Sequence, residues 1–213
     1  MKTASQFRAI AREKLQSKWT NAVLLTVLAE LILGVAGYIP CAVLLVTGPL
    51  QFGITRYYIL LHRQGKNEVN TLFDGLKEFA KNFVLGFLQT LYIVLWSLLF
   101  IIPGIIKSYS YAMCMYIRHD QPELEAGDCI KKSIEMMNGH KWRLFCLELS
   151  FLGWALLSVL TFGIGFFWLI PYMNASRTAF YEDLKGETEP TFAEENKVTI
   201  ETWQPEDPMK DFQ

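Results

Sequence analysis

The sequence has little of what a catalytic centre or a metal site needs. It contains three histidines and four cysteines, with no CxxC pair and no HExxH pattern. The nucleophile motif GxSxG, the dinucleotide motif GxGxxG and the Walker phosphate loop do not occur either. The cysteines lie mostly in or near apolar segments, which favours inert packing residues. We therefore expect no enzyme, no catalytic residue, no metal and no cofactor.

Charge is also scarce, at 19% of residues against 52% hydrophobic, whereas a soluble domain typically carries about 25%. The charges gather between six apolar runs: Thr20–Ile39, Cys41–Leu61, Phe83–Ile102, Gly104–Ile117, Leu144–Leu160 and Phe162–Tyr181. A bilayer core of about 30 Å needs about 20 apolar residues as helix. The runs predict an all-α, polytopic membrane protein with six transmembrane helices, and residues 1–181 form one membrane domain. The first run is too long for a signal peptide and is expected to remain.

The connections between the runs alternate in charge. Three turns carry none, namely Gly34–Pro40, Ile101–Ile105 and Thr161–Gly165, while the N-terminus and the other connections are rich in Lys and Arg. Lys and Arg near span ends stay on the cytoplasmic side. We predict both termini in the cytoplasm, with three hairpins that dip to the outer face.

The charge also divides along the chain. Residues before Glu182 hold 17 basic and 11 acidic side chains, and residues 182–213 hold 3 basic and 10 acidic ones. The basic inner rim is expected to bind anionic lipid headgroups. The tail from Glu182 is polar and shows no apolar period, which predicts an acidic, disordered cytoplasmic segment that recruits a protein partner. No nucleic-acid partner is expected, and oligomerisation is left open.

A short amphipathic stretch precedes each hairpin. The stretches are Ser5–Trp19, Thr71–Phe83 and Cys129–Phe145, and basic helices of this kind lie in the membrane interface. Trp19, Phe83 and Trp142 in these stretches follow one another at intervals of about 60 residues, a period typical of internal repeats. We predict three copies of one unit, over residues 5–63, 71–118 and 129–181.

Five charged residues lie inside the predicted spans, where charge is costly unless it is paired or hydrated. They are Glu30, Arg56, Lys107, Glu148 and Arg177. By depth, Glu148 is expected to pair with Arg56 or Arg177, whereas Glu30 has only Lys107 within reach. The five residues either fix the register of the helices or form an ion relay or a polar substrate cavity.

Two further features of the spans and connections complete the prediction. Pro49 and Pro171 are expected to kink the second and sixth spans. Two acidic groups in the inner connections are interpreted as solvated surface: Asp74 with Glu78, and Asp120, Glu123, Glu125 and Asp128.

Several short stretches, taken in order, carry a family resemblance. They are Phe73–Phe79, Ile101–Ile106, Tyr109–Ala112, Ser133, Asn138–Phe145, Leu149–Trp154, Pro171-Tyr172 and Ala179–Tyr181. With them the chain resembles the domain-of-unknown-function 975 family, multi-pass membrane proteins found mainly in Firmicutes. The resemblance runs from the N-terminal amphipathic segment to about Tyr181. It implies a multi-pass protein of the bacterial cell membrane, and it brings no activity and no catalytic residues.

Three functions are compatible with these features. The first is a non-enzymatic membrane protein that organises lipids or protein partners in the bacterial envelope, including peptide export or immunity. The second is a small transporter or ion-coupled carrier that uses the intramembrane charges. The third is a lipid-acting enzyme, for which His140, Lys141 and Arg143 are the least unsuitable phosphate-binding set.

Overall fold

The computed structural model describes residues 2–38 and 40–202, and within them every regular element is a helix. This confirms the all-helical prediction. In chain order the elements are α1 (Ala4–Leu15), α2 (Trp19–Ala36), α3 (Pro40–Gln64), the 3-10 helix η1 (Val69–Leu76), α4 (Phe79–Leu99), α5 (Ile101–Ser110), α6 (Cys114–Asp120), α7 (Ala126–Met136), α8 (Lys141–Leu149), α9 (Leu152–Leu160) and α10 (Phe166–Thr202).

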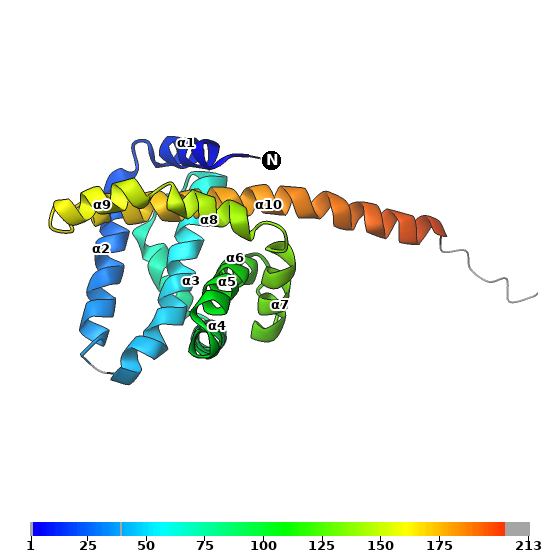
Figure 1. The fold of residues 1–213 in the computed structure, drawn as a ribbon, viewed down its shortest axis with the longest axis horizontal. Helices are drawn as coiled ribbons and strands as arrows, with labels where there is room; N and C mark the ends of the chain where they lie inside the picture. The colour runs from blue at the N-terminus through cyan, green and yellow to red at the C-terminus, as the bar shows by residue number, and fades with distance from the viewer. Residues whose placement is uncertain (1, 39, 203–213) are drawn as a thin grey trace, which may run out of the picture.

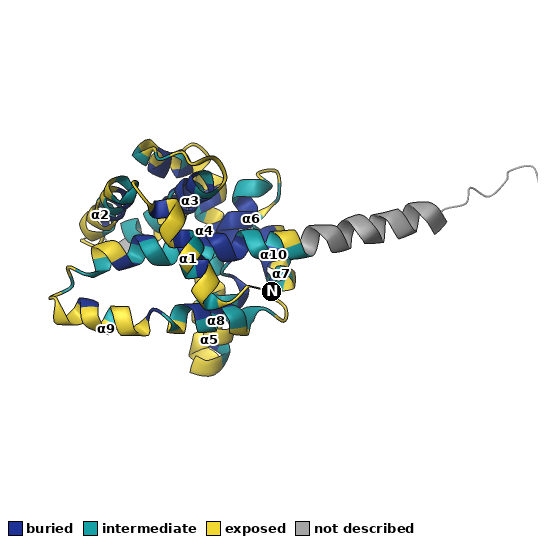
Figure 2. Ribbon diagram, turned by 90° about the horizontal axis from the view of Figure 1, so that it is seen from above, coloured by how far each residue is buried: buried dark blue, intermediate teal, exposed yellow. Residues whose placement is uncertain are grey.

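The long helices form three hairpins whose turns fall in the uncharged segments. α2 is followed by α3, α4 by α5 at Phe100, and α9 by α10 after a turn at residues 161–165. In Figure 1, α2 and α3 run down the page, α9 and α10 run across it, and α4 is seen nearly along its axis. Figure 2, turned by 90°, shows α2 and α3 nearly end-on. The hairpins therefore cross one another and do not form a parallel bundle.

The turns of the hairpins expose large apolar side chains. Tyr38 is 89% exposed at the first turn, Ile101 is 75% exposed at the second, and Phe162 is fully exposed at the third. The yellow ends of α9 and α5 in Figure 2 belong to this surface. Apolar patches of this size on a protein surface mark a contact with membrane or with another protein.

Within residues 2–38 and 40–202, three helical segments are long and apolar enough to cross a membrane, not six as the sequence suggested. They are Trp19–Ala36, Phe79–Leu99 and Lys141–Leu160, the outgoing limb of each hairpin. The returning limbs of the first two hairpins do not meet the criteria of length and hydropathy together, each for its own physical reason. α5 has 10 residues, which span about 15 Å, and the turn at residues 111–113 separates it from α6. α3 is longer, but polar residues such as Gln51 and Arg56 lower its hydropathy.

Glycines allow α3 to lie directly against η1 and α4. A Cβ added to Gly75 would lie 1.9 Å from the carbonyl oxygen of Pro49, and one added to Gly53 would lie 2.0 Å from that of Leu72. A Cβ on Gly86 would lie 2.5 Å from the Cα of Gly48. Such small residues let helix backbones approach closely where larger side chains would hold them apart. The first two hairpins therefore meet backbone to backbone.

The amphipathic segments pack onto the hairpins. α1 buries Phe7, Ala11 and Leu15, and the Phe7 ring meets Phe180 of α10 edge-on at 5.4 Å between centroids. η1 lies against α3, and α7 buries Cys129 and Ile130. These faces are thus part of the protein core.

The last helix extends further than the sequence suggested. α10 runs to Thr202 and projects beyond the other helices in Figure 1, whereas we expected irregular chain from Glu182. Ion pairs explain the difference for the first turns, because Glu182 and Asp183 bind cations of the helical body and hold this polar segment against it. Residues 203–213 of the predicted tail lie outside the described residues.

Candidate functional site

Glu148 and Arg177, two of the five candidate charges, form an ion pair. Arg177 Nη2 on α10 donates to Glu148 Oε1 on α8 at 2.6 Å, and the Tyr109 hydroxyl on α5 donates to Glu148 Oε2 at 2.7 Å. Arg177 is one of the two partners expected for Glu148. The pair joins the second hairpin to both limbs of the third.

This ion pair borders a polar cavity of about 380 Å³ between the hairpins. Its polar walls are Gln51, Thr55, Gln89, Ser108, Asn174 and the ion pair itself. Gln89 donates through Nε2 to the Tyr111 carbonyl at 3.2 Å, while its Oε1 is buried without a hydrogen-bond partner. The cavity thus offers a carboxylate, a guanidinium and a spare amide oxygen to a small polar group.

The other three candidate charges lie apart from this pair. Arg56 Nε is 3.0 Å from Asp74 Oδ2 at the end of η1, and not near Glu148. Lys107 lies over the Trp96 ring, 4.9 Å from its centroid. Glu30 is exposed on α2, and the pair with Lys107 that the sequence suggested does not form among the described residues. The five residues therefore do not build one relay.

Pro49 and Pro171 lie inside helices that continue through them. α3 runs unbroken from Pro40 to Gln64, and α10 passes Pro171 in its first turns. The Pro49 carbonyl is the atom that Gly75 of η1 approaches most closely. Pro49 thus lies at the contact between α3 and η1.

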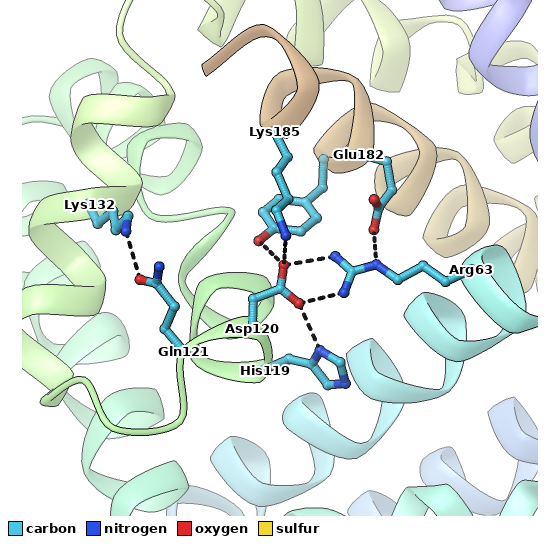
Figure 3. Close-up of polar contacts among 8 residues, drawn as sticks. Arg63, His119, Asp120, Gln121, Lys132, Glu182 and Lys185 are labelled. Carbon is cyan, nitrogen blue, oxygen red and sulfur yellow. Dashed lines mark hydrogen bonds and ion pairs between the residues drawn. The ribbon is translucent and has the colours of Figure 1, made fainter. Parts of the chain in front are cut away.

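The densest polar contact in the described chain surrounds Asp120, at the end of α6 (Figure 3). Arg63, at the end of α3, donates through Nη1 to Oδ1 at 2.8 Å and through Nη2 to Oδ2 at 2.7 Å. From α10, the Tyr181 hydroxyl and Lys185 Nζ each donate to Oδ2 at 3.0 Å. His119 Nδ1 lies 3.1 Å from Oδ1, and Arg63 Nε also binds Glu182 at 2.8 Å. We call these six residues the Asp120 cluster.

The Asp120 cluster joins the returning limbs of all three hairpins. The Asp120 side chain is 10% exposed and the Arg63 side chain is 29% exposed, so the carboxylate is largely withdrawn from water while the guanidinium partly reaches it. Burial opposes ionisation of Asp120, but hydrogen bonds from His119, Arg63 and Lys185 outweigh it and hold the pKa of Asp120 well below its usual range. A paired, hydrogen-bonded carboxylate of this kind keeps its charge and fixes the helices that supply its donors.

A second ionic group ties the N-terminus to α10. Arg143 on α8 donates to Asp183 at 2.7 Å and to Glu187 at 3.0 Å, and its guanidinium carbon lies 5.5 Å from the centroid of the Phe180 ring. Lys2 adds a second cation at 3.2 Å from Asp183. Against the effect of burial, hydrogen bonds from Lys2 and Arg143 lower the pKa of Asp183. Because two carboxylates already bind Arg143, it does not offer a free phosphate site.

The interpretation of the acidic connections as solvated surface is wrong for two residues. Asp74 binds Arg56 and is 19% exposed, and Asp120 is the centre of its cluster. Glu78 is exposed as expected, and it also binds the buried Arg118. The available signal was a parallel between two span ends, His62-Arg63-Gln64 and His119-Asp120-Gln121, which place opposite charges at matching positions. In the described residues no group of three or more His, Cys, Asp or Glu side chains is placed to hold a metal.

Comparison with known proteins gives one match. The family model described as "Protein of unknown function (DUF975)" matches residues 1–108 and 98–188, and thus covers all the helices up to the first half of α10. The chain matches none of the curated proteins and none of the solved structures with which it was compared. Since the matched segments span most of its length, the chain belongs to the DUF975 family of proteins of unknown function.

Proposed function

We propose that this chain is a multi-pass protein of the bacterial cell membrane that organises lipids or protein partners at the cytoplasmic face and catalyses no reaction. The observation that carries the proposal is the contrast between the two ends of the hairpins. Their turns expose apolar residues, while the Asp120 cluster joins the ends of α3 and α6 to α10. Such a molecule places three apolar hairpins in the membrane and keeps a charged platform outside it.

The proposed orientation rests on charge and on the exposed turns. The three turns carry no charge and expose apolar residues, whereas the connections on the opposite side of each hairpin are rich in Lys and Arg, which stay on the cytoplasmic side. We infer that all three hairpins enter the membrane from the cytoplasm and that both termini are cytoplasmic. The exposed basic residues Lys66 and Lys77 then face anionic headgroups, which attract Lys and Arg.

The structure also supports the threefold unit. Each of the three units places an amphipathic segment before a hairpin, and the returning limb of each contributes to the Asp120 cluster. Arg63 lies at the end of the first unit, Asp120 follows the second unit by two residues, and the two side chains bind each other.

We prefer an organising role to an ion-coupled carrier because of how the intramembrane charges are placed. Glu148 and Arg177 neutralise each other, and Glu30 lies on the exposed flank of α2. Partner recruitment falls to the acidic residues beyond Glu187, because Asp183 and Glu187 bind Arg143 of the chain itself. Residues 188–213 retain 7 acidic and 2 basic side chains.

Cysteine accessibility in intact cells tests the topology. In a background without native cysteines, Lys66→Cys and Lys77→Cys report the connection between the first two hairpins, and Tyr38→Cys and Phe162→Cys report two of the turns. We expect a membrane-impermeant maleimide to label positions 66 and 77 only after permeabilisation. Labelling of either position in intact cells would overturn the orientation.

Crosslinking tests partner recruitment. A chain that ends at Glu187 keeps the ion pairs to Arg63 and Arg143 and loses only the remaining acidic tail. We expect this truncation to remove crosslinked proteins that the full chain captures in the membrane. A matched control replaces residues 188–213 by a neutral Gly/Ser segment of equal length. An unchanged set of crosslinked proteins in both variants would refute the role of the tail.

A further inference from the structure

A second cavity lies inside the third hairpin and is not part of the polar sites described above. It has a volume of about 640 Å³ and opens between α9 and α10, next to the start of α2. Three of the six tryptophans of the chain, Trp19, Trp154 and Trp168, line it together with Tyr172. The volume falls within the range of about 300 to 1,000 Å³ that is typical of ligand sites.

The interior of this groove is apolar. Leu157 and Leu169 complete its walls, and its hydroxyl groups are already satisfied within the chain. Ser158 Oγ donates to the Trp154 carbonyl at 2.8 Å, and Thr161 Oγ1 donates to the Ser158 carbonyl at 2.9 Å. At the turn of the hairpin, Gly165 lies against Ser158 and brings the limbs together. A ligand in this groove is therefore stabilised by the burial of its hydrocarbon surface.

One cationic side chain lines the groove, at the end opposite the hairpin turn. Arg12 of α1 lines the cavity, is exposed, and donates through Nη2 to the Tyr172 hydroxyl at 3.5 Å. That long contact leaves the other guanidinium N–H groups available to a ligand. Guanidinium groups bind phosphate through paired hydrogen bonds, and Trp residues gather where a membrane meets water.

We propose that this groove binds one anionic phospholipid, with its phosphate at Arg12 and an acyl chain between α9 and α10. The charge of Arg12 selects the anionic headgroup, and the tryptophan walls bind the chain. The inference rests on the proposed membrane function and names the lipid that one of its surfaces holds.

Native mass spectrometry of the full chain in detergent tests the site. The protein is titrated with phosphatidylglycerol or with phosphatidylcholine of the same acyl chains, and the affinity of the first bound lipid is measured. We expect phosphatidylglycerol to bind first, and Arg12→Gln to weaken that first event about tenfold, the effect of losing a charge-assisted hydrogen-bonded contact. Lys14→Gln removes the same charge from the same helix outside the groove and should change the first event less than twofold.

A second variant tests the acyl-chain part of the groove. Leu157→Trp adds bulk to the wall and should weaken the first binding of both lipids, while circular dichroism confirms that the helices are retained. Quenching of tryptophan fluorescence by lipid brominated in its acyl chains gives an independent measurement. Because Trp168 lines the groove, the fraction of fluorescence that is quenched should be smaller in Trp168→Phe than in the wild type.

The outcomes separate the site from the wider proposal. Equal losses in Arg12→Gln and Lys14→Gln, or no preference for phosphatidylglycerol in the wild type, would overturn the lipid site. Neither result changes the maleimide pattern on which the proposed topology depends. Conversely, if the maleimide pattern contradicts the topology while the preference for phosphatidylglycerol persists, the lipid site stands and only the proposed orientation of the protein is wrong.

Discussion

Replacing Asp120 by Asn tests whether the Asp120 cluster holds the hairpins together. The amide has nearly the shape of the carboxylate but no charge, and its NH2 group cannot accept a hydrogen bond. Arg63 therefore keeps at most one of its two hydrogen bonds to this side chain, and Lys185 loses its ion pair. Breaking a fully buried ion pair costs about 3–5 kcal/mol. Arg63 and Lys185 are 29% and 31% exposed and Arg63 keeps Glu182, so solvent screening lowers our estimate to about 2 kcal/mol.

The free energy of unfolding of the detergent-purified protein measures this effect, with thermal unfolding followed by tryptophan fluorescence. A loss of about 2 kcal/mol corresponds to about 4–8 °C in the midpoint for a soluble domain of this size. Asp128→Asn is the matched control, because Asp128 is 53% exposed and binds only Lys131 at 3.2 Å. Its loss should be at most about 0.5 kcal/mol. Equal losses in the two variants would refute the reasoning, and so would a midpoint for Asp120→Asn that matches the wild type.

Three other measurements follow from the structure. Gly75→Ala should lower the free energy of unfolding by about 2 kcal/mol or more, because the added Cβ meets the Pro49 carbonyl. Gly127→Ala should raise the free energy of unfolding by about 0.5–1 kcal/mol, because an added Cβ there meets nothing within 4 Å. The reverse order of the two variants in chemical denaturation would contradict the packing. The folded-state pKa values of Asp120 and Asp183 are lowered, so the two carboxylates stabilise the fold above about pH 4, and this stabilisation is lost as the pH falls through the folded pKa. The free energy of unfolding should therefore decrease between about pH 5 and pH 2. Asp120→Asn should make this dependence on pH weaker. Arg177→Gln should destabilise the protein by about 1 kcal/mol, because it removes the cation that pairs with Glu148. Glu30→Gln should change the free energy of unfolding by no more than about 0.5 kcal/mol. The same thermal assay measures both variants, and a larger loss for Glu30→Gln would reveal a partner for that carboxylate.

The hairpins could be predicted from the sequence because their signals are local. Apolar runs and charge-free turns lie next to each other in the chain, and the turn at residues 161–165 was placed from them alone. The predicted depth along each apolar run also placed Glu148 level with Arg177, and the two residues form an ion pair. Such inferences need only the rise of a helix and the position of its ends.

The Asp120 cluster could not be predicted in the same way. Arg63 and Asp120 are 57 positions apart, and they meet because the hairpins cross, which depends on glycine contacts such as Gly48 with Gly86. An acidic residue in a polar connection has the same local pattern whether it is solvated or buried. The break between α5 and α6 was missed for a related reason, because the residues around Tyr111 remain apolar through the turn.

The ion pairs described above also determine when the fold can be completed during synthesis. A chain leaves the ribosome with its N-terminus first, so Arg63 and Asp120 are made long before Tyr181 and Lys185. The first residues wait as well, because Phe7 packs on Phe180 and Lys2 binds Asp183. The first two hairpins can form as they emerge, but both ends of the molecule are fastened only after α10 has been synthesised. A nascent chain that stops before Tyr181 therefore leaves Lys2 and Arg143 without the carboxylate that binds them in the finished fold.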